Sequence, residues 1–215
     1  MSTAASDDPR LAEDRVLGAM HPTRARLILT TVDLLDAEQP DRIGQEMVLQ
    51  ASGISKGSMY HHFEDFPDVV EAALVYRFHR VVDANIAAIN EALASANSRE
   101  DFISHVMAIT RMTQARERAP FRFERARALG RAGNSERFRM ALGVEQKRLT
   151  DAMTDVMRRA QAAGWLASDV DPRTVAVFVQ AYTLGKVIDD ITDEQMDPEA
   201  WNHLITRLFD RGLSA

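Results

Sequence analysis

Apolar residues recur at helical spacing along almost the whole chain. After Pro22, the residues Leu27, Ile28, Val32 and Leu35 fall on one face of a helix. Similar stripes predict helices over residues 41–51, 55–63 and 67–94, and others that begin near Ser98, Pro120, Phe138, Pro172 and Pro198. No alternating stretch of useful length predicts a strand. The pattern therefore predicts an all-α protein of about nine helices.

The most informative segment is Gln50–Phe63, which has the local features of two helices joined by a tight turn. Gly53 interrupts the apolar pattern, and glycine can adopt a positive φ without steric cost. Ile54 and Met59 can fill the space between the two helices. Ser55 has the side chain of a helix N-cap and would leave the next backbone N–H groups exposed at a positive helix end. This arrangement is typical of a helix-turn-helix, whose second helix can enter the major groove of DNA.

The side chains after Ser55 suit contacts with DNA. Lys56 can bond to guanine edges, Gly57 permits close approach of the backbone, and Ser58 can bond to several bases. The remaining polar groups of the segment could reach the flanking phosphates; they are Tyr60, His61 and His62. A helical corner without a DNA-binding role is the alternative. Adjacent histidines point about 100° apart on a helix and do not indicate a metal site.

The string SGISKGSMYHHF resembles the signature of the tetracycline-repressor (TetR) family of transcriptional regulators. The motif resemblance covers residues 24–74. It implies a three-helix, helix-turn-helix DNA-binding domain over residues 22–66 after a flexible N-terminal arm at 1–21. It also implies a helical ligand-binding and dimerisation domain over 67–215. By the same resemblance the DNA-binding residues are Gln45, Ser55, Lys56, Gly57, Ser58, Tyr60, His61 and His62.

The resemblance further implies a function and its partners. The expected protein is a homodimeric repressor that a small-molecule effector releases from a palindromic, double-stranded DNA operator. Three features depart from the family pattern: Ile43-Gly44-Gln45 replaces a capping threonine pair, Glu46 stands at a commonly basic or neutral position, and residues 64–68 are acidic and lack a lysine. The last departure removes one expected phosphate contact.

Composition limits the kinds of contact and location that are possible. The net charge is −6, and the first seventy residues carry six basic residues against twelve acidic ones, so DNA contact must depend on a few well-placed groups. The absence of cysteine excludes disulfides and thiolate zinc sites. No apolar run reaches the ~20 residues of a membrane span, and the acidic start does not resemble a secretory signal. We expect a cytoplasmic protein without membrane contact.

Residues 110–140 contain nine arginines and three glutamates. This excess favours one of two interpretations: Arg forks that bind an anionic effector, such as a carboxylate or an acyl thioester, or a solvated face with ion pairs. Adaptable Met and Phe side chains nearby could line a pocket or form ordinary core. The candidate pocket residues are Phe102, Met107, Met112, Phe121, Arg122, Phe123, Arg125 and Met153.

The last two predicted helices each carry an apolar stripe that could form a four-helix bundle across a two-fold axis. The resemblance implies the same arrangement; the alternative is that both stripes serve the core of one chain. The candidate dimer residues are Val175, Phe178, Val179, Tyr182, Gly185, Trp201, Leu204, Ile205 and Leu208.

Two other classes of function compete with a ligand-released regulator. A helical enzyme or metal carrier would need convergent acid, base or metal-binding residues, and the sequence contains no such set. We therefore expect no catalytic residues, no metal and no cofactor. A ligand-independent DNA-binding or partner-binding module differs only in that no small molecule would lower its affinity for DNA.

Overall fold

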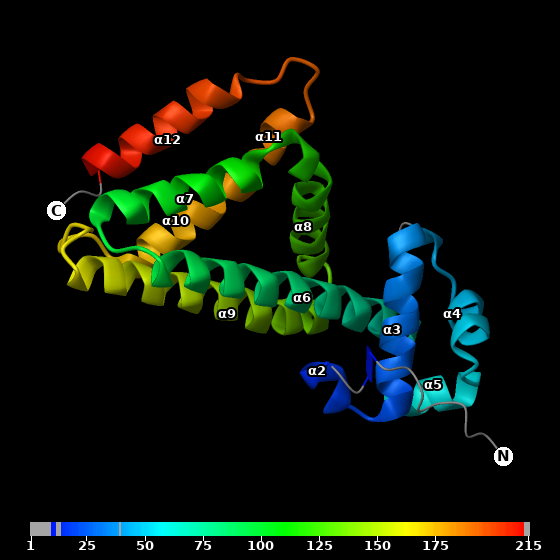
Figure 1. Ribbon diagram of the computed structural model, residues 1–215. Coiled ribbons are helices and arrows are strands. Elements are labelled where there is room, and N and C mark those ends of the chain that lie inside the picture. The colour runs from blue at the N-terminus through cyan, green and yellow to red at the C-terminus, as the bar shows by residue number, and fades with distance from the viewer. Residues whose placement is uncertain (1–9, 12–13, 39, 213–215) are drawn as a thin grey trace. The chain divides into compact units, whose positions relative to one another are not determined.

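The computed structural model describes residues 10–11, 14–38 and 40–212, and these ranges contain helices and no strands (Figure 1). Nine of the described helices have seven residues or more, so the predicted all-α fold of about nine helices is confirmed. The chain divides into two compact units, Met1–Arg80 and Val81–Ala215. Helix α6 (Phe66–Ala94) begins in the first unit and continues into the second.

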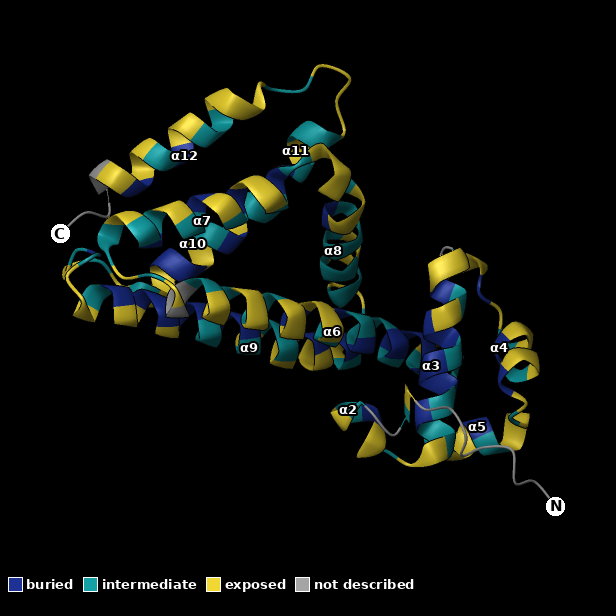
Figure 2. Cartoon of the chain, viewed as in Figure 1, coloured by how far each residue is buried: buried dark blue, intermediate teal, exposed yellow. Residues whose placement is uncertain are grey.

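The first unit is built around α3, whose apolar stripe is buried (Figure 2). Pro22 opens this helix, and the His21 ring accepts a hydrogen bond from the Thr23 N–H. The stripe packs against Val48, Met59 and the first turns of α6. Burying one large apolar side chain stabilises the folded state by about 1.5–3 kcal/mol. The helices of this unit before α6 are α2 (Arg15–Gly18), α3 (Pro22–Ala37), α4 (Gln45–Ser52) and α5 (Lys56–His62).

The N-terminal segment differs from the predicted flexible arm. Leu17 of α2 is only 1% exposed and belongs to the core of the first unit. The Asp14 carboxylate accepts hydrogen bonds from the Val16 and Leu17 N–H groups and from the Tyr76 hydroxyl, which fixes α2 against α6. Residues 14–21 are thus part of the packed unit, because their apolar and capping side chains have partners. Residues 1–9 and 12–13 of the predicted arm lie outside the described residues.

The helix expected over residues 41–51 is also shorter than predicted. Pro40–Arg42 form a 3₁₀ turn, and α4 begins only at Gln45. Gly44 is the N-cap and has no side chain with which to cap the helix. Ile43, between the 3₁₀ turn and Gly44, is 5% exposed and is buried in the core.

The second unit packs long helices against one another. Ser135 caps α9 by accepting a bond from the Phe138 N–H, and the α9 segment is followed by Gly164 with a positive φ of 74°. Helix α9 packs along α10 and α8, while α12 packs on α7 through Met107, Ile205 and Phe209. The further helices are α7 (Arg99–Gln114), α8 (Ala119–Ala132), α9 (Glu136–Ala162), α10 (Pro172–Gly185), α11 (Val187–Asp190) and α12 (Pro198–Gly212).

Two further properties concern the described residues only. None of their helices combines the length and apolar character that crossing a membrane requires. Within the same ranges, no three His, Asp or Glu side chains converge as a possible metal site.

Candidate nucleic-acid interface and internal cavity

A left-handed glycine makes the turn between α4 and α5. Gly53 has φ 67° and ψ 17°, and its N–H donates to the Leu49 carbonyl at 3.0 Å. The chain then enters α5 at Ser55, whose Oγ accepts from the Ser58 N–H at 3.2 Å. A side chain at position 53 would strain the backbone, because L residues rarely adopt this conformation. The turn and the cap therefore have the conformation that the sequence predicts.

Helix α5 has one buried face and one exposed face. Met59 is completely buried, and Phe63 just after the helix is 3% exposed. Lys56, Gly57 and His61 are exposed. A Cβ atom at Gly57 would have no neighbouring atom within 4 Å, so the space in front of it is open. The core thus anchors one face of α5, while Lys56, Gly57 and His61 face outward.

The structure brings α4 and α5 together at a polar contact. The Tyr60 hydroxyl donates to the Gln45 Oε1 at 2.9 Å, and the Tyr60 side chain is exposed. The Lys56 ammonium lies 6.0 Å from the centre of the Tyr60 ring. Three of the residues predicted to contact DNA therefore form one connected surface.

A histidine cluster lies at the C-terminal end of α5. The half-buried His62 ring is 4.4 Å from the His21 ring and 5.1 Å from the His61 ring, measured between centroids. Arg24 donates to the His62 carbonyl, and its guanidinium lies 4.1 Å from the centre of the Phe63 ring. Sequence reasoning missed His21 and Arg24, because they reach α5 from α3 through a tertiary contact that no local motif encodes.

The surroundings of His62 give the first unit a pH-dependent stability. Burial lowers the pKa of His62 below its usual 6.5, and the charges of His21, His61 and Arg24 lower that pKa further. As the pH falls below about 6.5, the unfolded chain takes up this proton more readily than the folded chain. The free energy of unfolding should therefore fall more steeply between pH 7 and pH 5 in the wild type than in His62→Gln.

Urea unfolding followed by far-UV circular dichroism measures this difference. A matched control is His203→Gln, on the exposed side of α12, which should follow the wild type. Parallel curves for His62→Gln and the wild type over this pH range would show that His62 is not responsible.

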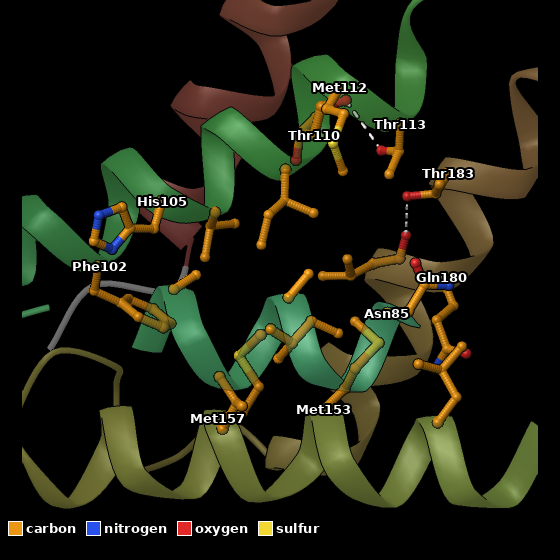
Figure 3. A pocket seen from close by; sticks show the side chains of 18 of the residues that line it. Asn85, Phe102, His105, Thr110, Met112, Thr113, Met153, Met157, Gln180 and Thr183 are labelled. Atoms are coloured by element: carbon orange, nitrogen blue, oxygen red, sulfur yellow. Dashed lines mark hydrogen bonds between the residues drawn. The ribbon is translucent and has the colours of Figure 1, made fainter. Parts of the chain in front are cut away.

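The second unit contains a cavity of about 120 Å³, shown in Figure 3. Its walls come from α6, α7, α9 and α10, and α8 contributes Arg125. Most of the lining side chains are apolar. The lining residues are Asn85, Ala88, Ile89, Ala92, Phe102, His105, Val106, Ile109, Thr110, Met112, Thr113, Arg125, Leu149, Met153, Val156, Met157, Val179, Gln180 and Thr183.

Only half of the predicted pocket residues line this cavity: Phe102, Met112, Arg125 and Met153. Met107 instead packs in the α7–α12 core, where the Thr206 hydroxyl contacts its sulfur. Phe121 is 54% exposed and lies beneath the Arg118 guanidinium, and Phe123 of α8 lies outside the lining. These three lie outside the cavity, and helical periodicity alone does not indicate which neighbour each face of a helix meets.

Arg122, which we also expected in the pocket, lies outside the lining of this cavity. Its guanidinium forms a two-pronged ion pair with Asp190, at 2.5 and 2.8 Å, and donates to the Thr113 and Ala115 carbonyls. Lys186 also reaches Asp190, at 3.2 Å. The side chains of Arg122 and Lys186 are 5% exposed and that of Asp190 is fully buried. The hydrogen bond from Arg122 lowers the pKa of Asp190 below its usual range, so this cluster joins α8 to α11 as ions.

The cavity residues that sequence reasoning missed include a stripe on α6. Asn85, Ala88, Ile89 and Ala92 follow i, i+3, i+4, i+7 spacing. The small side chains of Ala88 and Ala92 leave space that bulkier residues would fill. This signal was present in the sequence, whereas the contribution of Gln180 and Thr183 from α10 depends on tertiary packing.

The predicted dimer residues differ in how exposed they are and in which contacts they already have within the chain. Phe178, Leu204 and Leu208 are 42–50% exposed, and a Cβ atom at Gly185 would meet open space. Val175 and Ile205 are 3% and 2% exposed and belong to the chain's own core, so little of either side chain is available to a partner. The others also have contacts within the chain: Val179 with the cavity, Tyr182 with Thr110 at 2.9 Å, and Trp201 with Tyr182 at 6.4 Å between ring centroids.

No protein-family model matches the sequence, and no curated protein sequence matches it either. Solved structures do match it. A TetR-family transcriptional regulator from Mesorhizobium loti is 11% identical with a TM-score of 0.66, over 94% of this chain and 100% of the other. A TetR/AcrR-family regulator from Thermobifida fusca is 16% identical with a TM-score of 0.55, over 89% and 98% of the two chains. The transcriptional regulator FadR from Bacillus subtilis, in complex with stearoyl-CoA, is 12% identical with a TM-score of 0.58, over 87% and 97%.

These structural likenesses extend over most of each chain, while the sequences have diverged widely. They include both the helix-turn-helix and the C-terminal helices that surround the cavity. The chain therefore has the fold of the TetR-family transcriptional regulators.

Proposed function

We propose that the chain is a DNA-binding transcriptional regulator that reads its operator with the exposed face of α5. The observation that carries this proposal is the combination of a buried Met59 and an exposed polar surface around Lys56 and Tyr60. A short helix held rigidly by the core can present side chains in the major groove. The shared fold with transcriptional regulators supports the same function.

Each polar group on this surface has a proposed contact. Lys56, Ser58 and His61 contact base edges, and Gly57 lets the backbone approach them. Tyr60, His62 and Gln45 contact phosphates and set the register of the helix on the duplex. The hydrogen bond between Tyr60 and Gln45 positions both side chains for the same backbone segment. Because the first seventy residues are acidic in balance, these few groups must supply the attraction to DNA.

A homodimer would place two α5 helices in successive major grooves, about 34 Å apart on a near-palindromic operator. The exposed apolar side chains of α10 and α12, Phe178, Leu204 and Leu208, are the proposed contacts with the second chain. Burial of such side chains stabilises association. Val175 and Ile205 would support this face from the interior.

The cavity of the second unit is the proposed effector site. A ligand there would contact α6, and α6 also belongs to the DNA-binding unit. The ligand can lower affinity for DNA only if it binds one conformation of α6 better than another. In this scheme the regulator blocks transcription in the cytoplasm, and the effector releases it from the operator. No catalytic step is involved.

Selection from a random pool of duplexes with the purified full-length protein tests the proposal. Enrichment of an inverted repeat whose half-sites lie about 10 base pairs apart, or a multiple of that spacing, is the expected result. A pool that stays random after repeated rounds would contradict sequence-specific binding.

A further inference from the structure

One end of the cavity combines an aromatic ring, methionines and a histidine. Phe102 and His105 lie about one turn apart on α7, and Figure 3 shows both at this end. Met153 and Met157 of α9 lie along the adjoining wall. Aromatic rings pack favourably against other rings and against methionine sulfur. This part of the cavity therefore suits the flat ring of an aromatic molecule.

The His105 ring has an unused hydrogen-bonding atom. Its Nδ1 is buried and has no hydrogen-bond partner among the residues that the structure describes. A buried polar atom without a partner costs free energy, which a ligand recovers by bonding to that atom. A hydroxyl suits Nδ1 in either tautomer of the ring, because an O–H group can both donate and accept. The histidine thus offers a polar anchor beside the apolar wall.

Other polar side chains of the lining already bond within the chain. The Thr110 and Tyr182 hydroxyls are 2.9 Å apart and share a hydrogen bond. The Gln180 side chain accepts from the Gln146 amide at 2.6 Å and donates to the Thr150 hydroxyl at 3.2 Å. A ligand hydroxyl would have to compete for these groups, so the histidine ring is the better partner for it.

The charge in the lining does not call for a charged ligand. Arg125 donates to Gln146 and Gln180, and it has a further interaction within the chain. No Asp or Glu is among the described residues that line the cavity. A cation would find no acid there, and an anion would compete with the groups that Arg125 already contacts. Because a charge loses much hydration when it leaves water, this lining favours a neutral molecule.

The volume limits the size of the ligand. An engineered protein cavity of about 150 Å³ lined by aliphatic and aromatic side chains binds benzene. The present cavity of about 120 Å³ is slightly smaller. It therefore suits one six-membered ring with a small substituent.

We propose that this cavity binds a neutral, single-ring phenol, with the hydroxyl on His105 Nδ1 and the ring against Phe102, Met153 and Met157. Such a hydroxyl keeps its proton at neutral pH, because the pKa of a phenol, as in tyrosine, is near 10. The assignment rests on the proposed function in that the phenol is the effector.

Isothermal titration of the full-length protein with phenol, toluene and benzoate tests the ligand class. Phenol should bind at least as tightly as toluene, although its hydroxyl gives up bonds to water, because His105 supplies a new partner. Benzoate should bind at least about tenfold more weakly than phenol, because its charge loses more hydration. Toluene binding more tightly than phenol, benzoate binding within tenfold of phenol, or no binding of phenol would overturn the assignment.

Two histidine variants identify the partner of the hydroxyl. In His105→Leu, phenol should bind at least about tenfold more weakly than toluene, because its hydroxyl then lies in an apolar cavity without a partner. His203→Leu replaces an exposed histidine on α12 and should keep the wild-type order of affinities. An unchanged ratio of phenol affinity to toluene affinity in folded His105→Leu would overturn the role of His105.

Nitrogen-15 NMR of the wild type covers the case in which His105→Leu does not fold. His105→Asn keeps a hydrogen-bonding side chain at this position and removes the His105 ring signals, which assigns them. Phenol should shift the Nδ1 signal of His105 in the wild type, and toluene should leave it close to its position without ligand. Equal shifts with the two molecules would contradict a hydrogen bond between the hydroxyl and the ring.

A DNA titration separates this assignment from the proposed function. With the duplex from the selection experiment, saturating phenol should weaken binding of the wild type and leave His105→Leu unaffected at the same concentration. If phenol binds but no duplex does, the regulator proposal fails and the ligand class stands. If the duplex binds and phenol does not, the ligand class fails and the regulator stands.

Discussion

Gly57→Trp should lower the affinity for the selected operator by about 100-fold or more, because specific contacts account for a factor of this size or larger in protein–DNA binding. Position 57 faces open space in the free protein, with no neighbouring atom within 4 Å of a Cβ atom placed there. In the complex it would occupy the space where the proposed backbone approach brings α5 against the bases. The free energy of unfolding should change by no more than about 0.5 kcal/mol, as for an ordinary surface substitution.

Fluorescence anisotropy with a labelled duplex measures this effect. Gly143→Trp is the matched control, because Gly143 is an exposed glycine inside α9 with nothing within 4 Å of its Cβ position. This control should bind DNA like the wild type. If Gly57→Trp also bound normally, the surface at the start of α5 would not be the one that approaches DNA.

Asp190→Asn should lower the free energy of unfolding of the second unit by about 3–5 kcal/mol, the range for losing one partner of a buried ion pair. The asparagine keeps the shape but leaves the Arg122 guanidinium buried with no opposite charge at that position. Lys186 would retain only the contact with Asp189, at 3.2 Å. Both tryptophans, Trp165 and Trp201, belong to this unit, so urea unfolding followed by tryptophan fluorescence reports on it directly.

An exposed ion pair provides the comparison. Asp155 pairs with Arg158 at 2.6 Å, and both side chains are more than 60% exposed. Asp155→Asn should cost less than about 1 kcal/mol, because water and salt screen exposed charges. A similarly small effect of Asp190→Asn would show that the buried cluster does not stabilise the unit.

The helix-turn-helix could be predicted from the sequence because its determinants are local. Gly53 supplies the positive φ, Ser55 caps the helix, and Met59 faces the core, all within seven residues of one another. The tertiary partners of the same region could not be predicted. Asp14 meets Tyr76, and Arg24 meets His62, across separations of 62 and 38 residues.

The cavity shows where helical spacing stops being informative. Arg122 and Arg125 are one turn apart on α8, and the sequence predicted one role for both. In the structure, the Asp190 carboxylate, 68 residues further along the chain, pairs with Arg122, while Arg125 lines the cavity beside Gln180. The contacts of each arginine depend on which helix packs against that part of α8, and the spacing of the arginines along the sequence does not contain this information.

The apolar stripes of α10 and α12 had a similar ambiguity. Each stripe is wide enough to serve two surfaces: Val175 and Ile205 lie in the core of the chain, while Phe178 and Leu208 remain exposed. Sequence periodicity identified the stripes but could not show which residues of each stripe face the core and which stay exposed. That difference depends on the angle at which each helix meets its neighbours.

Hydrogen exchange of the full-length protein with and without the selected duplex tests the central claim most directly, because it reports which backbone amides the DNA covers. Our account predicts that the duplex slows exchange in residues 55–62 and leaves exchange in the helices of the second unit that lie away from the DNA unchanged. Unchanged exchange in residues 55–62, with protection confined to another surface of the protein, would contradict the claim that α5 reads DNA.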